Sequence, residues 1–366
     1  MYLHSMDWKQ ITRILGRRKA LSHRHAGKWV IGSASSTSGS RKYRLWVTPN
    51  PDGREQSPLV MMLHGCGQSA KDLAKICGMN AIADRNNFLV VYPEQPTEAN
   101  PLRCWNWFDP NHQARESGEP SILAAVIEQV VSSHNVDPDR VYVAGLSAGA
   151  AMAVVMGATY PDLFMAIGVV AGLEFAAATT AVAGLGAITR GGPEPNHQGL
   201  LAFQVMSVGL REKPKRRMPV IVFQGAADPY LNPVNADQVL TQWARTNDYL
   251  DGNGDGKSLL KQAGEMIEGS VPGGYSFQKC KYEDSAGRLL MEKWLVEGLG
   301  HAWSGSPSAG RFADPKGPNA SEEMWRFFCD TTLDSLDHPA SRPALRGALT
   351  NLFRQAVQSL KPSVER

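Results

Sequence analysis

The chain has 366 residues, of which 43% are hydrophobic, and its 38 Lys and Arg nearly balance its 35 Asp and Glu. The small net charge of +3, without a long basic block, argues against a nucleic-acid-binding protein. No apolar run approaches the roughly 18 residues of a transmembrane helix. The length and apolar content suffice for one large domain, which is the organisation we expect.

Residues 1–38 are expected to form a basic amphipathic N-terminal segment. It either docks on the body of the protein or attaches to a lipid-coated or polymer surface. The segment lacks the apolar run and cleavage site of a secretory signal, and polar residues follow Arg17-Arg18 where a twin-arginine signal would be apolar. We therefore expect a cytoplasmic protein, with association to polymer granules as a further option. The residues that can share the apolar face of a helix are Leu3, Met6, Ile11, Ile14 and Leu15.

Strand-like and helix-like segments alternate through residues 39–335, which we expect to form the catalytic domain. Such alternation predicts a mostly parallel central sheet with helices on both faces. Residues 172–217 fit no strand and are expected to be an insertion near the site, whereas 336–366 should form a helical segment packed on the same domain. The expected strands are 41–47, 59–63, 88–92, 137–145, 165–170, 220–223 and 289–296, and the expected helices are 70–86, 119–134 and 148–160.

The stretch Gly145-Leu146-Ser147-Ala148-Gly149 lies between a β-branched run and an alanine-rich helical segment. This is the strand–turn–helix context of a G-x-S-x-G nucleophile elbow, in which a strained turn lifts the serine hydroxyl above the sheet. Glycine suits both flanks because the strand and the helix come close together. The alternative is a small residue at a tight turn, but the placement favours Ser147 as a nucleophile.

A nucleophilic serine needs a histidine base, and the histidine needs a carboxylate that orients it. Asp228 and His301 each follow a predicted strand directly, and they complete the chain order Ser, Asp, His. Taken singly, Asp228 could be a turn residue and His301 part of a surface loop. Asp314 and Asp330 are the alternative carboxylates. The order favours a triad of Ser147, Asp228 and His301.

An oxyanion hole requires two backbone N–H groups, one of them from the residue after the serine. Ala148 supplies that group, and the segment LHGCGQS (63–69) offers Cys66 as the second donor. A nucleophilic thiol at Cys66 is the alternative, but no helix start follows it closely.

The chain offers no pattern that indicates a cofactor or a metal. The five cysteines contain no C-x-x-C pair. Residues 251–262 begin like a calcium loop, but Gln262 stands where the bidentate glutamate should be, so we interpret them as a polar surface turn.

Six segments together resemble the polyhydroxybutyrate depolymerase family of esterases, which also contains feruloyl and acetylxylan esterases: LVMMLHGCGQS, FLVVYPEQ, RCWNWFDP, DPDRVYVAGLSAGAAM, YPDLF and GLGHAWSG. The resemblance covers about residues 40–330. It implies an α/β-hydrolase fold, with Ser147, Asp228 and His301 at the triad positions and Cys66 and Ala148 at the oxyanion positions. It also makes a disulfide between Cys66 and Cys104 an expectation, against the reducing cytosol.

The chain departs from the family pattern in two ways. Gly225-Ala226-Ala227-Asp228 stands where the family usually has GDAD, so the triad carboxylate is kept while a neighbouring acid is lost. No polymer-binding module or Thr- and Ser-rich linker follows the catalytic part. The chain therefore looks more like the intracellular members, which act on stored polymer.

An ester substrate that is mostly hydrocarbon needs apolar surface around the reacting atoms. Trp105, Trp107 and Phe108 follow a predicted strand, and Trp303 lies two residues past His301. We expect Trp105, Trp107 and above all Trp303 to contact substrate, although each ring could instead pack the loops.

The leading hypothesis is a serine carboxylester hydrolase that cleaves poly(3-hydroxybutyrate) or its oligomers through an acyl-enzyme. A feruloyl or acetylxylan esterase is the alternative within enzymes. A non-catalytic protein that binds polymer granules is the alternative of another class, and the complete set of triad residues argues against it.

Overall fold

The computed structural model describes residues 26–49, 55–210, 214, 216–252, 265–284 and 286–336. Residues 1–25 of the N-terminal segment expected over 1–38, residues 253–262 of the turn expected over 251–262 and the segment expected over 336–366 after residue 336 lie outside the described residues. No helix within the described ranges is long and apolar enough to cross a membrane.

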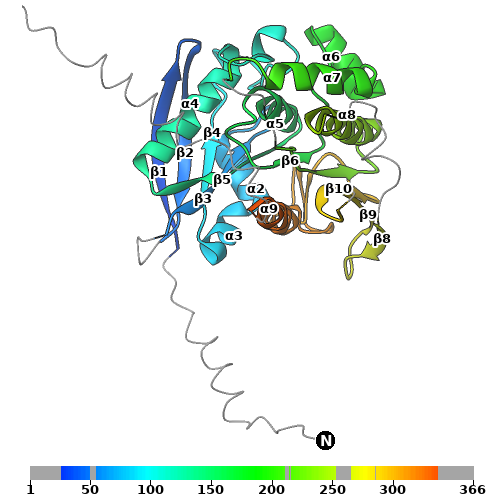
Figure 1. Cartoon of the computed structure of the whole chain (residues 1–366). Helices are drawn as coiled ribbons and strands as arrows, with labels where there is room; N and C mark the ends of the chain where they lie inside the picture. Colours follow the sequence, from blue (N-terminus) through cyan, green and yellow to red (C-terminus); the bar gives the residue numbers. More distant parts are fainter. Residues whose placement is uncertain are drawn as a thin grey trace, which may run out of the picture.

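Ten strands form one sheet in the order β1-β2-β4-β3-β5-β6-β7-β10-β9-β8 (Figure 1). The bounds are β1 Lys28–Ser36, β2 Gly39–Val47, β3 Ser57–Leu63, β4 Leu89–Pro93, β5 Val136–Leu146, β6 Ile167–Val170, β7 Val220–Gly225, β8 Glu265–Ser270, β9 Ser276–Glu283 and β10 Leu289–Val296. A second, two-stranded sheet pairs β11 (Trp303–Ser304) with β12 (Ala313–Asp314).

The centre of the large sheet is parallel, from β4 through β3, β5, β6 and β7 to β10. Most residues of these strands are buried and apolar, because helices cover both faces of the sheet. The two edges are antiparallel, with β1 and β2 at one and β9 and β8 at the other. The expected mostly parallel α/β architecture is therefore confirmed.

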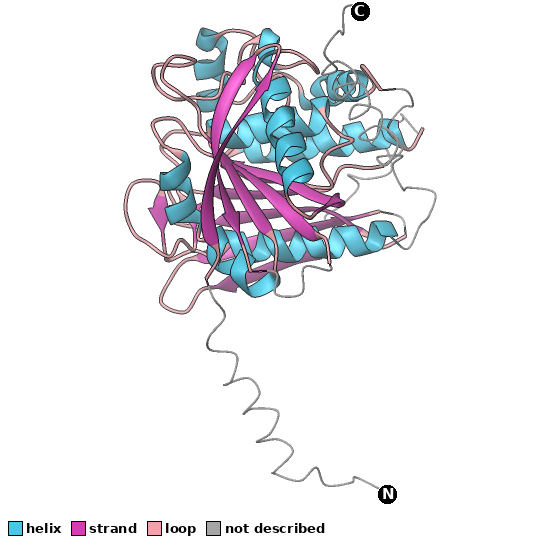
Figure 2. Cartoon of the chain, turned by 90° about the vertical axis from the view of Figure 1, so that its left-hand side faces the viewer, coloured by secondary structure: helices cyan, strands magenta, loops and turns pink. Residues whose placement is uncertain are grey.

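Helices pack on both sides of the sheet, as Figure 2 shows. One apolar cluster joins the sheet to α4, α5, α7 and α8, and a second joins its other face to α2, α3 and α9. The bounds are α2 Ala70–Cys77, α3 Met79–Asn86, η1 Pro110–His112, α4 Gly118–Ser133, α5 Ala148–Thr159, α6 Ala181–Arg190, α7 Pro195–Met206, α8 Val234–Leu250 and α9 Ala320–Leu336.

The expected helix over 70–86 is two helices, which meet at Gly78. Ser69 and Asp72 form a capping box at the start of α2, and Gly78 ends the helix with a φ of 65°. A left-handed residue breaks the helical path, and glycine adopts that conformation without strain.

Three strands of the large sheet were not expected from the sequence, and neither were the two short strands β11 and β12. β1 lies inside the segment predicted as a separate N-terminal element, and it pairs with β2 along its whole length. β8 and β9 form the opposite edge. These edge strands are partly exposed and carry many polar residues, so they lack the buried runs by which the central strands were found.

The expected insertion over 172–217 contains α6 and α7, which lie between β6 and β7 in the chain. α7 packs on α8, and α6 contacts the loop that carries Trp107. This brings α6 to the border of the candidate site.

A buried carboxylate attaches α9 to the sheet. Glu292 of β10 is fully buried and accepts two hydrogen bonds from Arg326, at 2.6 and 2.7 Å, and one from the Trp294 indole at 2.7 Å. Lys279 lies 3.1 Å away. Because Glu292 is removed from water, the loss of one of its partners should destabilise the fold more than the loss of a surface ion pair does.

We expect Arg326→Ala to lower the free energy of unfolding by about 2–3 kcal/mol, because it removes two charged hydrogen bonds from a buried acceptor. Arg85→Ala is the matched control, since Arg85 also joins α9 through Glu322 but both side chains are about half exposed. That change should cost less than about 1 kcal/mol. Urea unfolding measures both, and equal losses would contradict the prediction.

Candidate active site

Ser147 lies on a sharp turn between β5 and α5. Its φ and ψ are 57° and −121°, a conformation that is strained for any residue with a side chain. Its N–H donates to Val170 O at 2.9 Å, and its carbonyl accepts from Ala151 at 3.0 Å. These bonds hold the strained backbone between the next strand and the first turn of the helix.

At Gly145 and Gly149, the two glycines of the elbow, there is no room for a side chain. A Cβ at Gly149 would lie 2.1 Å from Leu63 O, and a Cβ at Gly145 would lie 2.4 Å from the Gly149 carbonyl. Any larger residue would force the helix away from the sheet. The strand–turn–helix geometry predicted from the sequence is thus present at Ser147.

Asp228 and His301 meet beside the elbow. His301 Nδ1 lies 2.7 Å from Asp228 Oδ2, and both side chains are nearly inaccessible to solvent. The loops that carry them touch, since a Cβ at Gly225 would lie 2.2 Å from Leu299 O. The alternative carboxylates have other partners: Asp314 accepts from Tyr275, and Asp330 accepts from Arg326.

The environment of Asp228 keeps it ionised. Burial by itself raises the pKa of this carboxyl, but the hydrogen bond and charge of His301 oppose it, as do backbone N–H groups of Leu231 and Tyr230 at 2.9 Å. The net effect is a pKa below the ordinary 3.8. An ionised Asp228 can orient the imidazole and stabilise its protonated form.

A cavity of about 250 Å³ opens beside these residues. Its walls are mostly apolar, and they bring the serine and the histidine together with both proposed oxyanion residues. The lining residues are Gly65, Cys66, Gln68, Trp107, Leu146, Ser147, Ala148, Leu173, Ile188, Tyr230, Leu231, His301, Arg311 and Phe312.

The loop after β3 is held by hydrogen bonds on both sides of Cys66. Gly65 N–H donates to Gln68 Oε1 at 2.8 Å, and Gly67 N–H donates to Leu102 O at 2.8 Å. In the part of the chain that the structure describes, the Cys66 N–H has no acceptor. It is therefore available to a group bound in the cavity.

His64 connects the same loop to the residues that follow β4 by hydrogen bonds. It is fully buried, and burial lowers the pKa of its imidazole, which keeps the ring neutral. Nε2 accepts from Gln95 N–H at 3.0 Å, so Nδ1 carries the proton and donates to Gly65 O at 2.9 Å.

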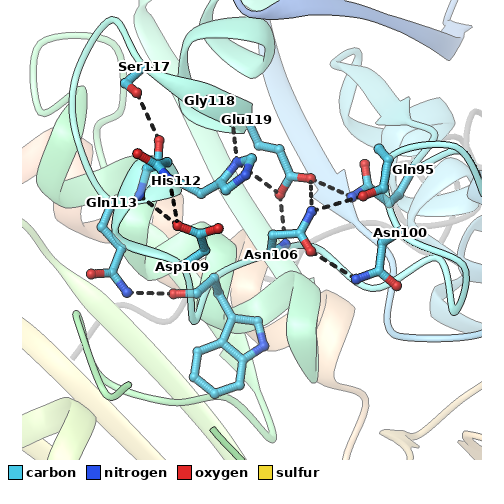
Figure 3. Close-up of polar contacts among 12 residues, drawn as sticks. Gln95, Asn100, Asn106, Asp109, His112, Gln113, Ser117, Gly118 and Glu119 are labelled. Atoms are coloured by element: carbon cyan, nitrogen blue, oxygen red, sulfur yellow. Dashed lines mark hydrogen bonds and ion pairs between the residues drawn. The ribbon is translucent and has the colours of Figure 1, made fainter. Parts of the chain in front are cut away.

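A disulfide joins Cys66 to Cys104, as the family resemblance led us to expect. The loop that bears Cys104 is itself fixed by a buried carboxylate (Figure 3). Glu119 accepts from Asn106 N–H and from Asn106 Nδ2, each at 2.8 Å, and from the Gln95 amide. The bridge and this network together hold the Cys66 loop.

The three tryptophans expected at the substrate differ in their positions. Trp107 lines the cavity. Trp105 is fully buried and donates its indole N–H to His64 O at 3.0 Å, and Trp303 is fully buried and donates to Ser321 at 3.1 Å. Neither of the last two lines the cavity, so substrate contact is retained only for Trp107. Trp303 packs in the core because β11 turns its side chain inward.

Several lining residues were not found from the sequence. Tyr230 and Leu231 follow β7, Ile188 comes from α6, and Arg311 and Phe312 come from the loop before β12. The position of Tyr230 two residues past Asp228 was a usable signal. The others reach the cavity only through tertiary packing.

Residues 41–271 match the family model described as Esterase PHB depolymerase. The chain belongs to that family. It is 31% identical over 255 residues to poly(3-hydroxyalkanoate) depolymerase C of Paucimonas lemoignei, an alignment that covers 69% of this chain and 57% of that protein. It is 29% identical over 211 residues to feruloyl esterase B of Neurospora crassa, covering 53% and 67%.

The chain thus spans little more than half the length of the first relative. Among solved structures, an acetyl xylan esterase from Aspergillus awamori superimposes with a TM-score of 0.62 at 17% identity, over 83% of this chain and 98% of that one. That likeness supports the fold, which is the α/β-hydrolase fold. The intracellular character expected from the sequence has no counterpart in these comparisons.

Cys104→Ser should reduce the free energy of unfolding by about 3–4 kcal/mol, the value for a loop of this size. The reason is that the Cys66 loop loses its covalent tie. Cys77→Ser, which alters a buried free thiol, is the control. Denatured, unreduced protein should titrate only Cys77, Cys280 and Cys329. Titration of all five cysteines would contradict the bridge.

Proposed function

We propose that this protein is a serine carboxylester hydrolase that cleaves poly(3-hydroxybutyrate) or its oligomers. The observation that carries the proposal is that one apolar cavity is lined both by a serine on a strained elbow and by a histidine that pairs with the buried Asp228. The named family relatives, which include a depolymerase and a feruloyl esterase, support ester hydrolysis.

The proposed reaction begins when Ser147 Oγ attacks the ester carbonyl carbon and His301 takes the hydroxyl proton. Asp228 holds the imidazole and stabilises its positive charge. The N–H groups of Cys66 and Ala148 donate to the oxyanion of the tetrahedral intermediate. Collapse breaks the C–O bond, and the departing alkoxide receives the proton from His301. An acyl group then remains on Ser147.

Water completes the cycle. His301 removes a proton from the water as the oxygen attacks the acyl carbon, and the second tetrahedral intermediate collapses to release the free acid. The proton returns to Ser147 Oγ. Besides the water molecule, the side chains and N–H groups named above supply every group that these reaction steps need.

An apolar rim around the cavity favours a hydrophobic polyester among the candidate substrates. We define this rim as Leu102, Val182, Leu185 and Tyr230, whose exposure ranges from 64% to 80%. Tyr230 lines the cavity, and Val182 and Leu185 share α6 with the lining residue Ile188. The Leu102 carbonyl accepts a hydrogen bond from the N–H of Gly67, which follows Cys66 in the chain. Apolar side chains exposed in one place indicate a surface that meets an apolar partner.

Location and granule association stay predictions. The Cys66–Cys104 disulfide weighs against the expected cytoplasmic location, because cytosolic thiol systems keep most cysteines reduced. Thiol trapping of the native protein during cell fractionation decides between an oxidising compartment and the cytosol.

Ser147→Ala should lower turnover of p-nitrophenyl butyrate by a thousandfold or more, the order expected when a triad nucleophile is removed. Asp228→Asn should lower it less, because the carboxylate orients the imidazole without reacting. Circular dichroism and thermal unfolding check that both variants fold. Retention of most activity by Ser147→Ala would refute the assignment, and an inactive wild type would favour the granule-binding alternative.

A substrate panel separates the esterase alternatives. Amorphous polyhydroxybutyrate, hydroxybutyrate oligomers, methyl ferulate and acetylated xylan are compared by kcat/KM. Fast turnover of methyl ferulate or acetylated xylan without release of hydroxybutyrate would favour a feruloyl or acetylxylan esterase.

Leu185→Glu should slow hydrolysis of amorphous polymer on the order of tenfold, because a charge replaces apolar contact with the surface. Hydrolysis of p-nitrophenyl acetate should not change. Val208→Glu is the matched control, since Val208 is equally apolar and 55% exposed but belongs to no element that lines the cavity. Equal slowing by both variants would show that the rim has no special role.

A further inference from the structure

The cavity contains one charged side chain that the proposed ester hydrolysis does not use. Arg311 is the only Lys or Arg among the described lining residues, and no Asp or Glu is found among them. Its guanidinium carbon lies 4.7 Å from the centre of the Phe312 ring. Arg311 is thus an exposed cation at the border of a mostly apolar cavity, and none of the lining residues is a carboxylate.

The backbone that carries Arg311 is a strained tight turn. Gly310 N–H donates to Ala313 O at 3.2 Å, and Ala313 N–H donates to Gly310 O at 3.1 Å, which leaves Arg311 and Phe312 at the tip. The φ of Phe312 is 64°. Glycine or asparagine is usual at such a position, and a bulky residue there is under strain. Strain of this kind clusters at active sites and ligand-binding positions.

The turn that carries Arg311 is held next to His301. Trp303 N–H donates to Phe312 O at 2.9 Å, and Trp303 pairs with Ala313 in the small sheet. The Phe312 ring stands edge-on to the His301 imidazole, with ring centres 5.9 Å apart and an angle of 81°. Phe312 thus contacts both the imidazole of His301 and the guanidinium of Arg311, which places Arg311 on the His301 side of the cavity.

The position beside His301 identifies the part of the substrate that Arg311 can reach. In the proposed reaction His301 gives its proton to the departing oxygen, so side chains around the imidazole face the leaving group. When the last ester bond of a hydroxyacid oligomer is cleaved, the leaving group is a hydroxyacid. Its free carboxylate lies only a few bonds from the departing oxygen. A guanidinium is the side chain best suited to bind such a carboxylate.

We infer that Arg311 binds the free carboxylate of the leaving hydroxyacid, which makes this protein selective for the carboxyl-terminal ester bond of hydroxyacid oligomers. The inference rests on the proposed esterase function. It adds a preference that an apolar cavity cannot provide, because the interior ester bonds of a polyester carry no charge.

The test compares two substrates that differ in one charge, the linear hydroxybutyrate trimer as its free acid and the same trimer as its methyl ester. The wild type should cleave the free acid with the higher kcat/KM and release monomer first. Arg311→Gln should lower kcat/KM for the free acid about tenfold to a hundredfold, the range for a lost hydrogen bond between charged groups. The methyl ester should be cleaved at the wild-type rate, and Arg311→Lys should keep part of the preference.

Lys316→Gln is the matched control, because it removes the same charge from an exposed residue just after β12 that does not line the cavity. Equal losses on both trimers in Arg311→Gln, or no loss on the free acid, would overturn the inference. A wild type that cleaves p-nitrophenyl butyrate but does not prefer the free acid would overturn the inference about Arg311 and leave the proposed esterase function standing. Failure to cleave p-nitrophenyl butyrate would overturn the proposed function as well.

Discussion

The whole site depends on one close approach of backbone to backbone, where α5 leaves the sheet at Ser147. The helix can start there only because Gly145 and Gly149 present no Cβ to each other or to Leu63. This contact forces Ser147 into its strained conformation and sets the distance between the serine and the loop after β3. The second close contact, between Gly225 and Leu299, does the same for the loops of Asp228 and His301.

Around these contacts the protein uses buried polar groups as fixed supports. Glu119 and His64 are both buried, and each has its hydrogen-bonding groups occupied by backbone or amide partners. A buried group with all its partners in place is costly to move, because moving it exposes an unpaired charge or donor to an apolar interior. The loop of Cys66 is held by such groups and by a disulfide, whereas the rim is made of exposed side chains.

The division between rigid and exposed parts matches a division of tasks. The groups proposed for bond breaking lie in the turns and loops that follow parallel strands, which the sheet holds in register. The groups proposed for choosing substrate lie on α6 and on the turn at Arg311, which interrupt or follow the strand–helix alternation. Substitutions in these outer elements can change the substrate without disturbing the elbow, so related chains of one fold can act on different esters.

The sequence by itself determined the central strands, the elbow and the order of Ser147, Asp228 and His301. These features follow from local rules: buried parallel strands are continuous apolar runs, and tight turns need glycine. Tertiary structure alone decided β1, β8 and β9, which lack long buried apolar runs, and the burial of Trp105 and Trp303. It also decided that Arg311 and Ile188 reach the cavity. Such positions depend on which surfaces pack together, and composition or spacing along the chain does not encode that.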